Sequence, residues 1–155
     1  MTSEEKPKIS FSILDTLLAF ANNSIGSNFF RNIYFNVNGQ KTDLTENGNL
    51  SCAVFVSSVL YLLKLSKDVH ITVDSTIKDL KESGWTETKD PKPGCVLVWA
   101  TKDFGASGAH RHIGFYIDEN KAVSNNPENG FPIEHKYDFF DGRPVELILI
   151  NPNLI

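Results

Sequence analysis

Apolar residues recur at helical spacing in three segments of the first half of the chain. Those from Ile13 to Ala21 lie on one face and predict an amphipathic helix over residues 10–23. Residues 52–63 are almost wholly apolar, so they predict a helix that is buried in the core. A third helix is expected over about 74–83, followed by Gly84, a residue that suits a helix end.

The period changes in the second half of the chain, where short β-rich runs follow one another. These runs predict strands at 96–99, 113–117, 121–124 and 145–150, and the middle two flank a tight turn and form a hairpin. Residues 22–49 are rich in Asn and Gly and predict a loop with one short strand at 32–37. Helices followed by strands indicate an α+β fold with an antiparallel sheet. A chain of 155 residues suits a single catalytic domain over 1–155.

Composition and charge exclude several classes of function. The chain has 15 basic and 19 acidic residues, a formal charge of −4, which argues against a nucleic-acid partner. No apolar run is long enough to span a membrane, so we expect no membrane partner. Glu4, Glu5 and Asp15 interrupt what would be a signal peptide, which predicts a protein that is cytoplasmic or exported by a non-classical route.

The two cysteines, Cys52 and Cys95, are too few for a disulfide framework and are considered separately. Cys52 begins the buried helix, where unpaired peptide N–H groups and the helix dipole favour a thiolate. The same N–H groups would hold the oxyanion that forms when a carbonyl is attacked. The alternative is that Cys52 is a small apolar residue on a core stripe.

Among the four histidines, only His110 and His112 stand at the start of a predicted strand, and they share one face of it. Either can receive a proton from a thiol, and the alternative for each is a surface histidine beside Arg111. Cys95, Cys52 and these two histidines would in principle complete a zinc site. The paired spacings typical of zinc ligands do not occur, so we expect neither a metal nor another cofactor, and Cys95 is expected to be a buried thiol.

Three blocks in this order resemble the NlpC-type cell-wall cysteine peptidases, which are related to the CHAP amidases. They are residues 50–56 (LSCAVFV), 92–99 (KPGCVLVW) and 112–117 (HIGFYI). The resemblance implies a papain-like fold with N-terminal helices packed on an antiparallel sheet. It also implies Cys52 as nucleophile, His112 as base and a substrate class of bacterial peptidoglycan peptides cut at an amide bond. The chain departs from the family at Ser51, where Asp is usual, and at Cys95, where the family has Asp.

A third residue is needed to orient the histidine and fix its tautomer. At the family's usual hairpin length this position falls on Ser124, where many relatives have His. Asn126 shares that strand face, and its amide oxygen is a good acceptor for a ring N–H. His135 is a further possibility if the loop before it folds back. We therefore predict a site of Cys52, His112 and either Ser124 or Asn126.

The preferred function is a cysteine peptidase or amidase that acts as a monomer through a thioester acyl-enzyme. Two alternatives stay open at this point. One keeps the catalytic pair and gives it another acyl substrate, such as a protein isopeptide or a lipid ester. The other is a degenerate NlpC-like binding module, in which the changed residues around Cys52 have removed cleavage and left ligand binding.

Overall fold

The structure is a computed structural model, and it describes residues 5–103, 108–139 and 142–154. The helices are α1 (Ile13–Asn23), α2 (Cys52–Leu62) and α3 (Val73–Glu82), with a short 3₁₀ helix η2 (Pro152–Leu154). The strands are β1 (Tyr34–Val37), β2 (Gln40–Asp43), β3 (Thr86–Glu87), β4 (Val96–Asp103), β5 (Ala109–Asp118), β6 (Lys121–Asn126), β7 (Phe131–Lys136) and β8 (Val145–Ile150). The chain therefore mixes helices and strands, and the predicted α+β class is confirmed.

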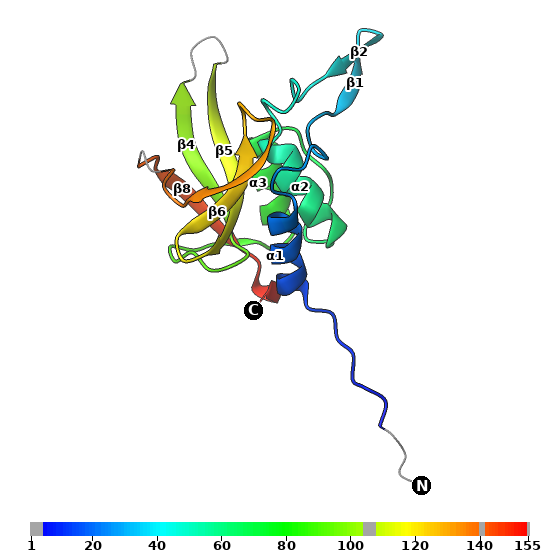
Figure 1. Cartoon of the computed structure of the whole chain (residues 1–155), viewed down its shortest axis with the longest axis vertical. Helices are drawn as coiled ribbons and strands as arrows, with labels where there is room; N and C mark the ends of the chain where they lie inside the picture. Colours follow the sequence, from blue (N-terminus) through cyan, green and yellow to red (C-terminus); the bar gives the residue numbers. More distant parts are fainter. Residues whose placement is uncertain (1–4, 104–107, 140–141, 155) are drawn as a thin grey trace.

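Six of the strands form one sheet in the order β3-β8-β4-β5-β6-β7. Every neighbouring pair in this sheet is antiparallel. The three helices gather on one side of the sheet, with α2 next to β5 and β6 (Figure 1). The sheet consequently has one face under the helices and one face turned away from them.

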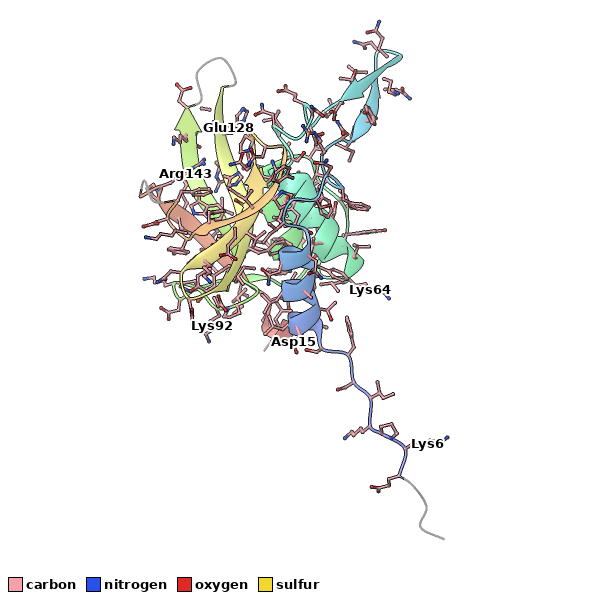
Figure 2. All side chains as sticks on the ribbon, viewed as in Figure 1. Lys6, Asp15, Lys64, Lys92, Glu128 and Arg143 are labelled. Carbon is pink, nitrogen blue, oxygen red and sulfur yellow. The ribbon has the colours of Figure 1, made fainter. Side chains whose placement is uncertain are left out.

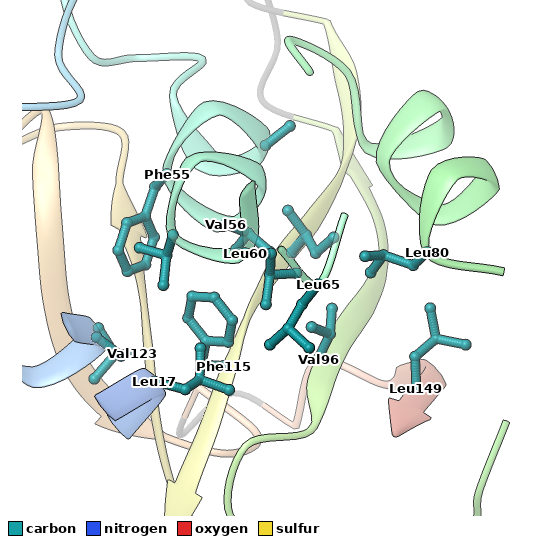
Figure 3. Packing of buried hydrophobic residues seen from close by; sticks show 14 of the residues in the cluster. Leu17, Phe55, Val56, Leu60, Leu65, Leu80, Val96, Phe115, Val123 and Leu149 are labelled. Carbon is teal, nitrogen blue, oxygen red and sulfur yellow. The ribbon is translucent and has the colours of Figure 1, made fainter. Parts of the chain in front are cut away.

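The main core lies between the helices and the sheet. Phe55 and Val56 of α2 are fully buried, and the Phe55 ring meets Phe115 of β5 edge-on, with 5.5 Å between the ring centroids. Leu17 of α1 and Leu149 of β8 close the two sides of this cluster (Figure 3). An apolar run such as 52–63 forms a buried helix because every side of it meets another apolar surface.

The opposite face of the sheet carries a second apolar cluster. Alternation along β4 places Leu97 and Trp99 there, together with Tyr116 of β5 and Ala122 of β6. The indole N–H of Trp99 donates to the carbonyl oxygen of Tyr137 at 2.8 Å, which ties the segment after β7 over this face. The ring of His112 lies against Trp99 of this second cluster, with 5.4 Å between the ring centroids.

The predicted short strand at 32–37 corresponds to β1, and the structure adds strands that were not predicted. The first of these is β2, which pairs with β1 in a hairpin that projects from the body of the protein (Figure 1). Its turn is Asn38-Gly39, with both φ angles positive, the backbone that a two-residue hairpin requires. The strands β3 and β7 were also not predicted, because β3 has only two residues and β7 contains Pro132, which in sequence argues against a strand.

The first helix is part of the folded body, since Leu17 and Ala21 of α1 are fully buried. Among the described residues, no helix combines the length and the apolar character that crossing a membrane requires.

A buried carboxylate, Asp79, holds the connection between α2 and α3. Its oxygens accept from the peptide N–H groups of Lys67 and Asp68 at 3.0 Å, from His70 Nε2 at 2.6 Å and from the Ser83 hydroxyl at 2.8 Å. Burial by itself raises the pKa of this carboxyl, but the hydrogen bonds outweigh it and lower the pKa to about 2. The ionised form is therefore the one that stabilises the fold.

We predict that Asp79→Asn lowers the free energy of unfolding by about 2 kcal/mol at pH 7, from 1.36 kcal/mol per pKa unit. An amide offers one acceptor oxygen and turns its NH₂ toward peptide donors. Because the folded pKa lies below the unfolded one, this stability is present above about pH 4 and disappears as the pH falls toward 2. Urea unfolding at pH 7, 4 and 2.5 measures it, with the exposed neighbour Glu82→Gln as control. A pH-independent difference would contradict the assignment.

Candidate active site

A cleft of about 900 Å³ opens where the start of α2 meets the first half of β5. Cys52, His112 and Asn125 line it, together with Glu128 and Arg143. In Figure 2, Glu128 and Arg143 lie toward the upper end of the sheet. The predicted nucleophile and base therefore line the same cleft.

Cys52 is the first residue of α2 and is half-buried, with a free thiol. The peptide N–H groups of Ile113, Ala53 and Cys52 itself face the sulfur and act to lower the pKa of the thiol. Those of Cys52 and Ala53 are N–H groups of the opening turn, which have no partner within a helix. The N–H group of Ile113 belongs to β5, and Ile113 directly follows His112 in the chain.

The end of the β5–β6 pairing explains how Ile113 reaches the thiol. Both peptide groups of Tyr116 point toward the β4 side. Its carbonyl oxygen accepts from the N–H of Gly94 at 3.0 Å, and its N–H donates to the carbonyl oxygen of Cys95 at 2.9 Å. Peptide groups alternate along a strand, so Ile113 directs its N–H toward β6. The β5–β6 register begins at Gly114 and Ser124, one residue further along β5. The sulfur thus sits where this ladder ends.

His112 lies on the face of β5 that points away from α2, in the second apolar cluster. Its ring is 7% exposed and packs against Trp99 at 5.4 Å and Phe139 at 5.6 Å between centroids. Its Nε2 atom is 2.8 Å from the hydroxyl of Ser124. The structure therefore brings Ser124, one of the two predicted orienting residues, into contact with the predicted base.

His135 stands directly behind Ser124. Its Nε2 atom is 2.6 Å from the Ser124 hydroxyl, and its Nδ1 atom is 2.7 Å from the carbonyl oxygen of Lys136. The sequence offered His135 only as an alternative to Ser124, because the strand β7 that carries it was not predicted. The structure instead joins His112, Ser124 and His135 in one chain of hydrogen bonds.

The other residues considered from the sequence take different places. The side-chain oxygen of Asn126 accepts from the peptide N–H of Asn129 at 2.9 Å and closes the turn after β6. His110 is exposed. Cys95 is fully buried in the second cluster, and its sulfur accepts from the peptide N–H of Lys92 at 3.4 Å. In the described ranges, no group of three or more metal-binding side chains is arranged to hold an ion.

Burial governs the charge of the two reactive groups. It raises the pKa of the Cys52 thiol, and this effect exceeds the lowering by the three peptide N–H groups and by the charge of Arg143. For His112, burial first, and then Arg143 and His135, lower the pKa to about 3. The helix start acts on the sulfur as expected, but the expected resting thiolate is not favoured. At neutral pH both groups are uncharged.

Arg143 was not found from the sequence. Its Nε donates to the carbonyl oxygen of Ala100 at 2.9 Å, and its Nη2 donates to that of His110 at 3.0 Å. These contacts hold the guanidinium at the cleft, where its charge acts on both Cys52 and His112. No local motif marks the residue, because the pairing of β8 with β4 brings it there.

Asn125 is a second site residue that sequence reasoning missed. Its side-chain NH₂ donates to the carbonyl oxygen of Gly48 at 2.7 Å and joins two walls of the cleft. Gly48 has φ +88°, and a Cβ atom there would lie 2.4 Å from the Cα of Gly130. Only glycine allows these two loops to approach so closely.

No protein-family model matches this sequence, and comparison with curated proteins finds no match.

We predict that iodoacetamide alkylates Cys52 slowly at pH 7, with a rate that rises about tenfold per pH unit toward pH 9. The thiolate is the reactive form, and burial keeps its fraction small. Peptide mapping by mass spectrometry reads Cys52 and the buried Cys95 in one sample, and urea-unfolded protein gives the reference for both. A fast rate that stays constant from pH 5 to pH 8 would contradict this prediction, since it would require a preformed thiolate–imidazolium pair.

Proposed function

We propose that this protein is a papain-like thiol hydrolase that cuts amide bonds in bacterial peptidoglycan peptides. One observation carries the proposal: the thiol of Cys52, at the start of a buried helix, shares a cleft with His112, whose Nε2 atom contacts Ser124. Nucleophile, base and orienting group in this order are the parts that a thiol hydrolase needs.

The sequence blocks that resemble the NlpC-type peptidases support the fold assignment. They fall at the start of α2, on β4 and within β5, and the helices lie on one face of an antiparallel sheet. This arrangement is compatible with a papain-like fold and supports the proposal. The cleft walls carry both signs of charge, Arg143 and Glu128 among them, which suits peptides that bear free amines and carboxylates.

In the proposed reaction the sulfur of Cys52 attacks the carbonyl carbon of the amide, and the thiol proton passes to His112. Peptide N–H groups at the start of α2 would hold the oxyanion. The C–N bond then breaks, and His112 gives its proton to the leaving amine, which leaves a thioester on Cys52. Water then attacks the thioester, and His112 accepts one proton from this water molecule. The C–S bond breaks, and the proton returns to the sulfur.

Because Cys52 and His112 are both uncharged at rest, the rate of the proposed attack depends on proton transfer. Proton transfer has to accompany the attack, because neither a thiolate nor an imidazolium is favoured beforehand. Ser124 is an uncharged acceptor, and it stabilises the imidazolium less than a carboxylate would. We therefore expect modest turnover.

We predict that Cys52→Ala lowers the hydrolysis of stem-peptide fragments by about 10⁴-fold or more, as the loss of a nucleophile does. Alanine is a good helix former, so the fold should survive. Mass spectrometry of fragments after incubation in H₂¹⁸O detects the new carboxyl groups, and circular dichroism follows the fold. Cys95→Ala is the matched control.

Two outcomes would contradict the proposal. If Cys52→Ala kept the parent rate, the nucleophile would lie elsewhere. If the parent protein bound the fragments and released no product, the site would be a binding module.

We also predict that Ser124→Ala lowers kcat by about ten- to a thousand-fold, the range for positioned acid–base groups. Asn126→Ala should stay close to the parent value, because its amide oxygen is engaged by Asn129. Steady-state rates on the same fragments compare the two variants. Equal rates in both would show that the hydroxyl of Ser124 does not orient the base.

A further inference from the structure

We propose that His135 is a positioning residue: acting through Ser124, it fixes His112 with its proton on Nε2, so that Nδ1 holds the lone pair that accepts the thiol proton. The inference deepens the proposed function and rests on it for the catalytic role of His112. It concerns which nitrogen of the base carries the proton, a property that the position of the ring alone does not decide.

The direction of the hydrogen bonds is set from the far end of the chain. The carbonyl oxygen of Lys136 can only accept, so the Nδ1 atom of His135, 2.7 Å away, must carry a proton and donate it. Burial lowers the pKa of His135, although the Lys136 carbonyl and the Glu134 charge act in the opposite sense. A neutral ring has a single N–H, so the Nε2 atom of His135 is an acceptor.

The hydroxyl of Ser124 passes this direction on. The hydroxyl oxygen lies 2.6 Å from Nε2 of His135. Because this Nε2 carries no proton, the hydroxyl has to donate its single proton to it. Its lone pairs are then left to face Nε2 of His112 at 2.8 Å, and that nitrogen has to be the donor. A neutral His112 with its proton on Nε2 keeps Nδ1 free as a base.

Ser124 alone could not make this choice. A hydroxyl both donates and accepts, so a serine without His135 would pair equally with either tautomer of His112. His135 removes the ambiguity because its own partner is a carbonyl oxygen. The residue that selects the tautomer, His135, therefore lies on β7, and Ser124, which contacts His112, lies on the neighbouring strand β6.

The ring of His135 is held rigidly enough for this task. It is 8% exposed and stacks on Phe139, with 3.9 Å between centroids and 14° between planes. Trp99 lies 5.5 Å from it on another side. In the sheet register His135 faces Ala122, whose small side chain leaves room for the ring.

The test reads the tautomer directly. Long-range ¹H–¹⁵N NMR spectra of protein labelled at histidine nitrogen, recorded at pH 7, distinguish a protonated Nε2 from a protonated Nδ1. The parent should show His112 protonated on Nε2. In His135→Phe, which preserves the stacking, His112 should become a mixture of both tautomers, and kcat on peptide fragments should fall about ten- to a hundred-fold with little change in KM.

Two further variants complete the comparison. His135→Gln places an acceptor oxygen near the original Nε2 and should restore both the Nε2–H tautomer and part of kcat, which a merely structural role would not do. His70→Gln, far from the chain of hydrogen bonds, should leave the His112 tautomer unchanged. If His135→Phe does not fold, the Gln variant and the parent spectrum still decide the question.

The proposal is overturned if the parent carries the His112 proton on Nδ1 or on both nitrogens. It is also overturned if His135→Phe keeps the parent tautomer and rate. Failure of the proposed function would look different, since the parent would then show the Nε2–H tautomer and its dependence on His135 but no hydrolysis of any fragment.

Discussion

The burial of α2 against β5 and β6 is the constraint on which the site depends. A helix as apolar as 52–63 has to fill the space above the sheet, and close packing fixes its position to within a fraction of a turn. Its first residue, Cys52, thereby comes to the point where the β5–β6 ladder ends, close enough to Ile113 for the peptide N–H of that residue to lower the pKa of the thiol. A shift of α2 by one residue would move the sulfur away from Ile113, so the packing of the core also fixes the place of the thiol.

The same burial determines the electrostatics of the site. It works against charge on Cys52 and on His112 alike, and the charge of Arg143 favours the thiolate while it disfavours the imidazolium. The peptide N–H groups at the start of α2 are already oriented, so under the proposed reaction they would stabilise the oxyanion without reorganisation. At rest, the site holds both Cys52 and His112 uncharged.

The sequence predicted the elements that carry strong periodicity, and it missed those whose place is set by distant partners. The α2 helix, the last strand β8 and the positions of Cys52 and His112 follow from local pattern, since apolar runs and helix starts are local properties. The strand β2 was missed although the Asn38-Gly39 turn before it is a recognised hairpin signal. Arg143 reaches the cleft through pairing between strands far apart in sequence, which a scan along the chain does not reveal.

The small size of residue 124 allows two imidazole rings to meet at one hydroxyl group. Ser124 is 1% exposed and small, so an imidazole ring fits on each side of its hydroxyl. A large side chain at this position would touch His112 itself and fill the space that His135 occupies. Trp99 and Phe139 pack against both imidazole rings. These aromatic contacts do not determine which ring nitrogen carries a proton. Packing therefore fixes where the rings lie, and the carbonyl oxygen at the end of the hydrogen-bond chain fixes where the protons lie.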